Sequence, residues 1–366
     1  MFRKQLAAIF LMLLPLSVWA QQSHLQSITL ESGYVPGAVE IAVLHPAEVK
    51  ASEGPLPLIL FFHGGGGSSS DLNRFRPIIE EAWKRNILPP AVVAMPSAER
   101  SFYLDFQDNS QQWETFILSD LIPHLRANFN LVQDASKTVI MGISMGGMGS
   151  LRMAFKDPTS FLAVAALEPA IEAAYSYDTI DAIDRTYRSE ALYQSLFGNP
   201  VDLDYWQLSH PPYIARENME TLKDSGLNIY IEVGNEDRLN LFRGGEMLHR
   251  LLFDAGLKHE YRLVHRADHT GESILPRVLN ALELTAKRAS FPHSEHSFRV
   301  VNYHLVECPA LVDHHRLFLF SYSHFKYERQ KIQVLKAEVV ENVDCESRNF
   351  EKVIFVNDGR PTVICG

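Results

Sequence analysis

Short apolar runs alternate with longer segments of helical period through most of this chain, and this alternation constrains its fold more than any other feature. The runs are rich in β-branched and aliphatic residues, and they cover residues 58–62, 91–95, 138–141, 162–167, 227–233 and 260–264. Between them, residues 111–129 and 241–255 carry apolar side chains at helical spacing. Uniformly apolar strands joined by helices are typical of a parallel sheet covered on both faces. The chain is therefore predicted to be an α/β protein with a mostly parallel central sheet flanked by helices.

The two ends of the chain differ from this central pattern. Residues 27–30 and 40–44 have the composition of two further strands, and we expect them to form an antiparallel edge of the same sheet. From residue 291 onward, the apolar runs at 317–321, 331–340 and 352–356 follow one another without helical segments. We therefore predict a main domain over residues 21–290 and a small C-terminal extension, rich in β-structure, over residues 291–366. A long irregular extension fits the pattern equally well.

The first twenty residues are typical of a secretory signal. Arg3 and Lys4 give a positively charged start, residues 6–18 are apolar, and the small residue Ala20 ends the segment. The apolar run is shorter than the roughly 20 residues that a membrane-spanning helix requires. We therefore expect cleavage after Ala20, export to the periplasm or the medium, and a mature chain without stable membrane insertion.

The three cysteines, Cys308, Cys345 and Cys365, all lie in the predicted extension. The main domain is therefore expected to fold without disulfides. Outside the cytoplasm one pair can bridge and leave one free thiol, and the spacing does not select which pair.

Composition removes several classes of function. The chain carries 34 Lys and Arg against 44 Asp and Glu, for a formal net charge of −10, and it has no run rich in basic residues. Nucleic acids and anionic membranes attract basic proteins, so neither is expected as a partner. Because 46% of the residues are hydrophobic, the chain is also too apolar to be disordered. The expected ligand is a small molecule, and the oligomeric state is left open.

One pentapeptide carries the most specific chemical signal. Gly142, Ser144 and Gly146 form the sequence G-x-S-x-G, which directly follows the predicted strand 138–141 and precedes a helix-forming stretch. A serine between a strand and a helix in this pattern is a nucleophile elbow, because the tight turn presents the hydroxyl at the sheet edge beside the N–H groups of a helix N-terminus. Ser144 is therefore predicted to be a catalytic nucleophile.

A second motif, His63 followed by four glycines, ends the predicted strand 58–62. It matches the HGGG-type loop that supplies one N–H of the oxyanion hole in esterases and lipases. The other N–H comes from the residue after the nucleophile, which is Met145 here. Side chains would obstruct so close an approach, so glycine is required on geometric grounds. We expect the loop donor to be Gly65 or, as the second choice, Gly66.

A serine hydroxyl is a weak nucleophile, so it requires a base within hydrogen-bond reach and an acid that orients the base. In the nucleophile-elbow fold the acid precedes the histidine along the chain. The last two predicted strands lead into Glu236-Asp237 and Asp268-His269, at strand ends where open α/β sheets bind ligands. Asp237 is the predicted acid and His269 the predicted base. Glu236 and His265 are the competing candidates, although His265 lies at the end of its strand, where a structural histidine is more common.

Together these motifs resemble the esterase family of the α/β-hydrolase superfamily, which includes esterase D/S-formylglutathione hydrolase, feruloyl esterases and related acyl hydrolases. The matching blocks span about residues 57–288 and do not cover residues 291–366. In that family the acid stands three residues after the glycine of its block, which is Gly234 here, and the histidine commonly follows an aspartate. The resemblance therefore implies the α/β-hydrolase fold and the same choice of Asp237 and His269.

These roles describe a serine carboxylic-ester hydrolase acting on a small-molecule or sugar-linked ester. Ser144 attacks the carbonyl while His269 takes its proton, an acyl-serine forms, and water activated by His269 releases the acid. Neither half of the reaction requires a metal or an organic cofactor. Three alternatives stay open: a thioesterase of the S-formylglutathione hydrolase type, an acyltransferase, and, from a different class, a binding protein built on an inactive hydrolase domain. Export argues against the thioesterase, because a cytosolic glutathione adduct is not expected outside the inner membrane.

Two weaker patterns are not assigned to the site. The segment between the predicted strands 162–167 and 227–233 is rich in aromatic residues, including Tyr177, Tyr193 and Trp206, and would suit a phenolic or sugar-linked ester. Aromatic packing onto the sheet is the simpler interpretation. His314 and His315 match no metal-ligand spacing, and adjacent residues on a strand point to opposite faces, so no metal site is predicted.

Overall fold

The computed structural model describes residues 23–47, 54–134, 137–185 and 187–289, together with six strands in the last part of the chain. The chain divides into two compact units between Phe291 and Pro292. The predicted signal sequence, the three cysteines and the paired histidines of the extension lie outside the described residues.

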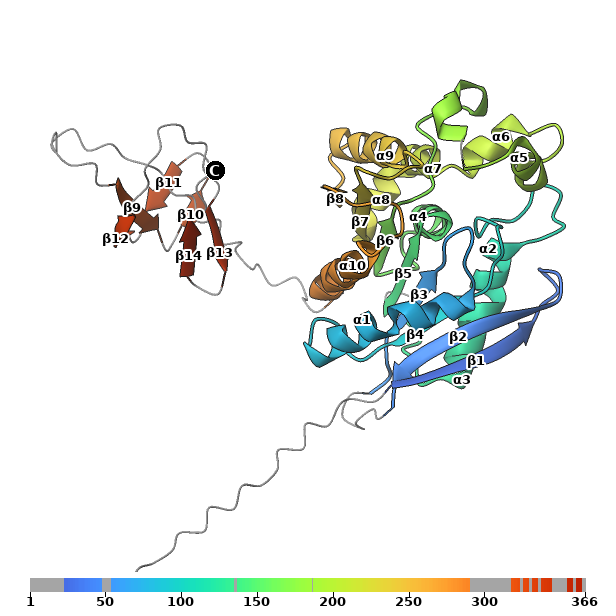
Figure 1. Cartoon of the computed structure of the whole chain (residues 1–366), viewed down its shortest axis with the longest axis horizontal. Helices are drawn as coiled ribbons and strands as arrows, with labels where there is room; N and C mark the ends of the chain where they lie inside the picture. Colours follow the sequence, from blue (N-terminus) through green and yellow to red (C-terminus); the bar gives the residue numbers. More distant parts are fainter. Residues whose placement is uncertain are drawn as a thin grey trace, which may run out of the picture. The chain divides into compact units, whose positions relative to one another are not determined.

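An eight-stranded sheet forms the centre of the first unit (Figure 1). Its strands are β1 (Ser23–Glu31), β2 (Ala38–Pro46), β3 (Leu58–Phe62), β4 (Val92–Pro96), β5 (Thr138–Ile143), β6 (Ala163–Leu167), β7 (Asn228–Gly234) and β8 (Glu260–Val264). They lie in the order β1-β2-β4-β3-β5-β6-β7-β8. β2 pairs antiparallel with β1 and with β4, whereas every neighbouring pair from β4 to β8 is parallel. The prediction of a mostly parallel sheet with an antiparallel edge is confirmed.

Successive residues of the central strands enter two separate hydrophobic layers. In β3, Leu60 and Phe62 join one buried cluster, whereas Ile59 and Phe61 join the other. A strand sends alternate side chains to opposite faces, so a strand that is apolar at every position must be covered on both sides. The burial agrees, because the side chains of β3 are at most 2% exposed.

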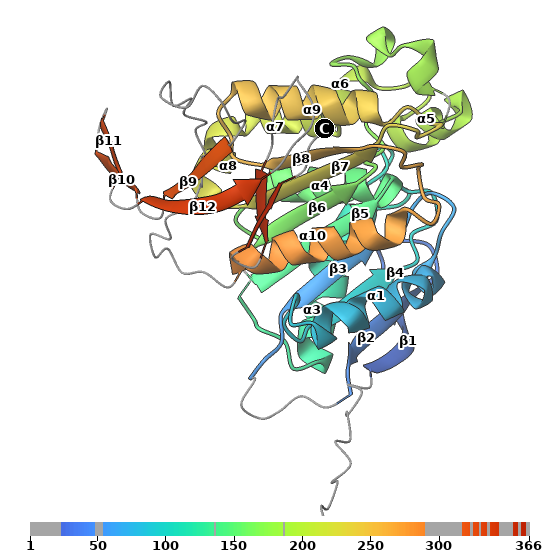
Figure 2. The same ribbon diagram turned by 60° about the vertical axis from the view of Figure 1, so that its left-hand side comes forward.

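Helices supply this cover (Figure 2). Those that pack on the parallel part of the sheet include α1 (Leu72–Lys84), α4 (Met145–Lys156), α9 (Phe242–Asp254) and α10 (Ile274–Ala289). Buried residues of α1 and α10 join the cluster on one face, and those of α4 and α9 join the cluster on the other. The helix predicted over residues 241–255 corresponds to α9. No helix in the described residues combines the length and the apolar character needed to cross a membrane.

The helix predicted over residues 111–129 is divided into three consecutive helical segments. They are α2 (Trp113–Phe116), a π-helical turn (Ile117–Leu121) and α3 (Ile122–Asn128). Pro123, near the start of α3, has no N–H and cannot donate the helical hydrogen bond to the carbonyl four residues earlier. A widened π-type turn is a common form of such an interruption. The prediction of a single regular helix was therefore wrong, although the segment is helical where expected.

Between β6 and β7 the chain inserts the helices α5 (Glu190–Phe197), α6 (Leu203–Leu208), α7 (Pro211–Glu217) and α8 (Met219–Ser225). The aromatic rings of this insertion pack on one another. Tyr177 contacts Tyr193 edge to face, with 5.1 Å between ring centroids, and contacts Trp206 in the same way. Tyr193 and Trp206 are each 1% exposed. For these residues the packing interpretation is confirmed.

In the second unit the described strands form antiparallel pairs. They are β9 (Leu317–Tyr322) with β12 (Ala337–Val343), β10 (Phe325–Glu328) with β11 (Lys331–Val334), and β13 (Ile354–Asn357) with β14 (Arg360–Val363). The extension therefore contains β-structure as expected, although the run predicted over residues 331–340 is divided between β11 and β12.

The parallel strands bring the predicted site residues to one edge of the sheet. β3 leads into His63, β5 into Ser144, β6 into Glu168, and the loops after β7 and β8 carry Asp237 and His269. Because neighbouring parallel strands end on the same side, residues far apart in the sequence meet there.

Candidate active site

Ser144 lies at a strained turn between β5 and α4. Its φ of 57° and ψ of −114° fall outside the ordinary regions for a residue with a side chain. Its N–H donates to the carbonyl of Leu167 at 2.8 Å, and its carbonyl accepts the N–H groups of Met148 and Ala170 at 3.0 Å each. Met145 begins α4, so its N–H has no acceptor within the helix. The surrounding backbone therefore holds the serine in its unusual conformation.

Close packing explains the two glycines of the pentapeptide. A Cβ atom at Gly142 would lie 2.3 Å from the carbonyl of Gly146. A Cβ atom at Gly146 would lie 2.3 Å from the carbonyl oxygen of Phe62 in β3. These obstacles are backbone atoms, which cannot rotate away as a flexible side chain would. The G-x-S-x-G pattern is thus a packing requirement of the turn.

Three of the predicted site residues form one chain of hydrogen bonds. Nε2 of His269 lies 3.0 Å from Oγ of Ser144, and Nδ1 of His269 lies 3.2 Å from Oδ2 of Asp237. The side chain of Asp237 is completely buried, whereas that of His269 is 13% exposed. The Asp237 carboxylate also accepts the N–H groups of Leu239 at 2.8 Å and Leu241 at 3.3 Å. The structure therefore brings together residues from three separate loops.

The surroundings of Asp237 keep its carboxyl ionised. Burial by itself raises the pKa, but the hydrogen bond and charge of His269, with the N–H groups of Leu239 and Leu241, hold the pKa of Asp237 below its usual range. An ionised carboxylate can only accept hydrogen bonds, so the pattern assigns the imidazole proton to Nδ1 of His269. Nε2 is then free to accept the proton of the Ser144 hydroxyl.

The competing candidates lie outside this chain of hydrogen bonds. Glu236 is exposed, and its backbone N–H donates to the carbonyl of Ala267 at 3.0 Å. His265 is also exposed, and its Nδ1 lies 3.4 Å from Nδ2 of Asn235. The geometry therefore favours Asp237 over Glu236 as the acid and His269 over His265 as the base.

The glycine loop passes directly beside the serine. The N–H of Gly67 donates to the carbonyl of Gly64 at 2.9 Å and closes a turn with Gly65 and Gly66 at its centre. A Cβ atom at Gly64 would lie 3.6 Å from Cβ of Ser144. Within the described part of the chain, no hydrogen bond uses the N–H of Gly65 or of Gly66. Two unused donors therefore lie in the loop that the sequence assigned to oxyanion binding.

His63 anchors this loop. Its ring Nε2 accepts the N–H of Ala98 at 2.9 Å, and its Nδ1 donates to the carbonyl of Gly64 at 2.7 Å. The backbone N–H of His63 donates to the hydroxyl of Tyr103 at 2.9 Å. Burial lowers the pKa of the His63 ring, although the Gly64 carbonyl and the charge of Asp71 oppose this effect. The first residue of the motif is thus a neutral structural histidine.

A cavity of about 330 Å³ connects the serine, the histidine and the glycine loop. Its lining comprises His63, Gly64, Gly65, Gly66, Gly67, Asp71, Arg74, Phe75, Ile143, Ser144, Arg238, His269, Thr270 and Ile274. The volume is at the small end of the range found for ligand sites, which is about 300–1,000 Å³. It therefore suits a small or medium ester.

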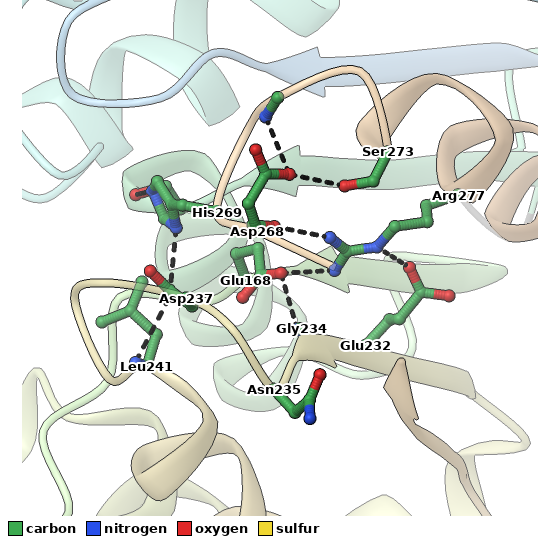
Figure 3. Close-up of polar contacts among 12 residues, drawn as sticks. Glu168, Glu232, Gly234, Asn235, Asp237, Leu241, Asp268, His269, Ser273 and Arg277 are labelled. Atoms are coloured by element: carbon green, nitrogen blue, oxygen red, sulfur yellow. Dashed lines mark hydrogen bonds and ion pairs between the residues drawn. The ribbon is translucent and has the colours of Figure 1, made fainter. Parts of the chain in front are cut away.

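Sequence reasoning missed two buried residues that adjoin the site, Glu168 and Arg277 (Figure 3). Glu168, Asp237 and His269 each have an oxygen or nitrogen atom that could bind a metal ion, and these three atoms all lie within 4.8 Å of one another. However, Oε1 of Glu168 accepts the N–H of Gly234 at 2.7 Å and Nη2 of Arg277 at 2.5 Å. Arg277 therefore already supplies a positive charge beside Glu168, and the group is better described as a hydrogen-bonded network. The available signal was that Glu168 directly follows a strand at the edge that carries Ser144.

A family model described as "Putative esterase" matches residues 32–273. The chain belongs to this esterase family. It is a carboxylic ester hydrolase, and the resemblance based on its motifs is confirmed.

Relatives of this esterase with similar sequences are also esterases. It is 31% identical over 188 residues to an acetyl esterase of Caldicellulosiruptor saccharolyticus, a match that covers 50% of this chain and 67% of the relative. It is 29% identical over 130 residues to an esterase of Mycobacterium tuberculosis, a match that covers 34% of this chain and 27% of the relative. The match to the mycobacterial protein thus spans only about a quarter of that relative.

Solved structures with a similar fold include a ferulic acid esterase, with a TM-score of 0.60, 16% identity, and coverage of 73% of this chain and 99% of that one. An S-formylglutathione hydrolase of Staphylococcus aureus gives a TM-score of 0.60 at 17% identity, covering 72% of this chain and 99% of the other. At such low identity the likeness shows the fold alone. This esterase has the predicted α/β-hydrolase fold.

Proposed function

We propose that this esterase hydrolyses small carboxylic esters through an acyl-enzyme on Ser144, with His269 as the general base and Asp237 as the acid that orients it. The observation that carries the proposal is the continuous chain of contacts from Oγ of Ser144 through His269 to Asp237, with distances of 3.0 and 3.2 Å. In this scheme the N–H groups of Met145 and of Gly65 or Gly66 stabilise the oxyanion.

The reaction proceeds in two halves. In the first, Oγ of Ser144 attacks the ester carbonyl, Nε2 of His269 takes the hydroxyl proton, and the imidazolium then gives that proton to the departing alcohol. In the second half, His269 takes a proton from water, the resulting hydroxide attacks the acyl-serine, and the proton returns to Oγ as the acid leaves. Asp237 stays ionised throughout and stabilises the imidazolium.

One relative is named an acetyl esterase, which supports a small acyl group, and a protein with a similar fold is named a ferulic acid esterase, which points to a larger aromatic acyl group. The cavity of about 330 Å³ is compatible with either. We also propose export, with Gln21 as the first residue of the mature protein, a prediction that N-terminal sequencing of the exported form tests. Thioester hydrolysis and acyl transfer use the same residues and are the alternatives.

The experiment is hydrolysis of p-nitrophenyl esters with acyl chains of two to twelve carbons by wild-type protein and by Ser144→Ala. We expect activity that peaks at one short chain length and is lost in Ser144→Ala. A matched control is Ser70→Ala, because Ser70 is exposed near the glycine loop but contacts Ser68 rather than the site. Equal activity in wild type and Ser144→Ala would refute the mechanism. A thioester and an added alcohol acceptor, assayed in parallel, distinguish the alternatives.

A further inference from the structure

A second buried network, centred on Glu168, lies beside Asp237 and His269 (Figure 3). Glu168 is completely buried and has a φ of 48°, which is unusual for a residue with a side chain. Its N–H donates to the carbonyl of Glu232 at 2.7 Å. Its Oε1 accepts the N–H of Gly234, the last residue of β7, at 2.7 Å. Glu168 is thus attached to the start of the loop that carries Asp237.

Arg277 of α10 connects this glutamate to the histidine loop. Its Nη2 donates to Oε1 of Glu168 at 2.5 Å, and its Nη1 donates to the carbonyl of Asp268 at 3.1 Å. Asp268 immediately precedes His269. The Nε atom of Arg277 donates to Oε1 of Glu232 at 2.5 Å. One guanidinium therefore joins β6, β7 and the loop of the histidine.

The charges of this network do not balance if every acid is ionised. The titratable or charged groups that face Glu168 are Asp237, His269, Glu232, Arg277 and Tyr261. Arg277 contacts both glutamates and can neutralise one of them. Arg262 also faces Glu232 but is paired with Glu260 at 2.8 Å, and Asp237 retains its own charge. Oε2 of Glu168 is buried and has no hydrogen-bond partner among the described residues. A bare negative oxygen in the interior is costly, whereas a protonated carboxyl avoids most of that cost.

The burial of Glu168 leads to the same conclusion as the count of charges. It raises the pKa of Glu168 to about 8, an effect that the charge and hydrogen bond of Arg277 oppose and the charge of Asp237 reinforces. At neutral pH Glu168 then carries a proton.

Building on the roles given above to Ser144, Asp237 and His269, we propose that Glu168 is a positioning residue of the site. It is a protonated carboxyl that holds the loops of Asp237 and His269 together and leaves Asp237 as the single negative charge beside the imidazole. Its ionisation would place a second negative charge within 4.8 Å of His269. Such a charge would stabilise the imidazolium form of the ring.

The test is the pH dependence of inactivation by a p-nitrophenyl alkylphosphonate, followed by release of p-nitrophenol. The acid limb reports the ionisation of His269 in the free enzyme. In wild type we expect a second rise in rate near pH 8, because ionised Glu168 stabilises the imidazolium that forms during attack. In Glu168→Gln, which is nearly isosteric and always neutral, we expect the acid limb to stay in place and the second rise to disappear.

Glu232→Gln provides a matched variant with a different expected result. Without Glu232, the acid that remains in direct side-chain contact with Arg277 is Glu168, so Glu168 ionises and the acid limb moves to higher pH. A purely structural role would lower the rate in both variants by a factor independent of pH.

The wild-type profile alone keeps the proposal falsifiable if a variant fails to fold. A single ionisation in wild type would overturn it, as would an acid limb that moves to lower pH in Glu168→Gln, since that shift means Glu168 is charged at neutral pH. Identical behaviour of the two variants would also overturn it. Absence of any reaction with wild type would instead contradict the proposed function itself.

A separate observation concerns the charge of the substrate. Arg74 and Arg238 line the cavity, both are exposed, and neither forms an ion pair within the described residues. Arg74 donates from Nη2 to the carbonyls of Thr270 at 2.9 Å and Gly271 at 3.0 Å. Asp71 is the one carboxylate in the lining. The described cavity wall thus carries two guanidiniums against one carboxylate.

The position of these arginines selects one part of the ester. Under the proposed function, His269 protonates the leaving alcohol, so groups beside His269 adjoin that alcohol. Arg74 is held on the two residues after His269, and Arg238 directly follows Asp237. We infer that the preferred esters carry a negatively charged group, such as a carboxylate, on the alcohol part. Opposite charges across the cavity favour such a substrate over a neutral one.

The probes are the acetate esters of 4-hydroxybenzoate and of 4-hydroxybenzamide, which have similar shapes and differ in charge. We expect the ratio of their kcat/KM values, corrected for the rates of alkaline hydrolysis, to favour the benzoate in wild type. In Arg74→Gln or Arg238→Gln the ratio should fall by about tenfold, mainly through KM, as expected for about 1.4 kcal/mol of lost attraction. Arg85→Gln, an exposed change outside the cavity, should leave it unchanged. Equal ratios in all four proteins would overturn the inference, whereas inactivity on both esters would contradict the proposed function.

Discussion

Replacement of Gly146 by alanine tests whether the elbow glycine is needed for packing. The new Cβ would lie 2.3 Å from the carbonyl oxygen of Phe62, 2.6 Å from its carbonyl carbon and 2.7 Å from its Cβ. To restore ordinary contact, β3 and α4 must separate by roughly 1 Å, a shift comparable to those of overpacked cores. β3 cannot move alone, because it is hydrogen-bonded to β4 and β5 on its two sides.

The expected cost is therefore at the upper end of that for overpacking, about 3 kcal/mol. For a folded unit of this size, 1 kcal/mol corresponds to about 2 °C in Tm, so Gly146→Ala should lower Tm by about 6 °C. The matched control is Gly66→Ala. A Cβ atom at Gly66 would meet nothing within 4 Å, and its φ is not in the left-handed region. That change should alter stability by no more than about 0.5 kcal/mol.

The assay is thermal unfolding followed by circular dichroism, on wild type and both variants in one buffer. A Tm of Gly146→Ala within 1 °C of wild type would refute the packing argument. An equal loss in Gly66→Ala would refute it as well, since glycine would then matter through chain entropy or loop conformation rather than through the contact with Phe62.

Three further predictions concern charge. Asp237→Asn should keep near wild-type stability but lower kcat on p-nitrophenyl acetate by on the order of 10³-fold or more, because the imidazole loses the carboxylate that orients it; a loss below tenfold would contradict its role. Burial and the charge of Arg188 lower the pKa of His210 to about 3, so between about pH 6.5 and 3 the unfolded chain binds a proton that the folded chain does not. The free energy of unfolding should then fall by about 1.4 kcal/mol per pH unit of acidification, a slope that urea titrations should find reduced in His210→Gln. Glu172→Gln should cost about 3–5 kcal/mol in urea unfolding, because it leaves the completely buried Arg188 without its partner at 3.1 Å. The surface change Glu220→Gln should cost less than about 1 kcal/mol, and similar losses in the two would refute the burial argument.

Features that the sequence predicted correctly rest on short-range physics. The parallel strands were found because burial on both faces demands an apolar residue at every position, as in β3. The elbow was found because the turn at Ser144 requires glycines two residues before and after it. That spacing is local in the sequence, although the atom that excludes a side chain at Gly146 belongs to Phe62 in β3. The order of acid and histidine followed from the topology, which places the loops after β7 and β8 at the same edge.

Features that the sequence did not predict depend on contacts between distant residues. Glu168 and Arg277 are 109 positions apart, and an isolated glutamate after a strand has no pattern that names its partner. The π-helical turn before Pro123 was missed for a different reason. The apolar period of a helix tolerates one widened turn, so periodicity alone does not detect where the hydrogen-bond pattern changes.

The backbone at the carboxyl edge of the sheet is strained at two adjacent points, and the strain is shared. Ser144 and Glu168 both have positive φ, at 57° and 48°, although both carry side chains. They are linked through the backbone, because Ser144 donates its N–H to the carbonyl of Leu167 and Glu168 donates its N–H to the carbonyl of Glu232. Such conformations persist only where the surroundings determine them. The elbow of the serine is thus supported by Leu167, the last residue of β6, and Glu168, which follows it, ties the loops of the acid and the histidine. Because the support of the serine runs through backbone groups, Glu168→Gln should leave the serine in place and change only the charge near the imidazole.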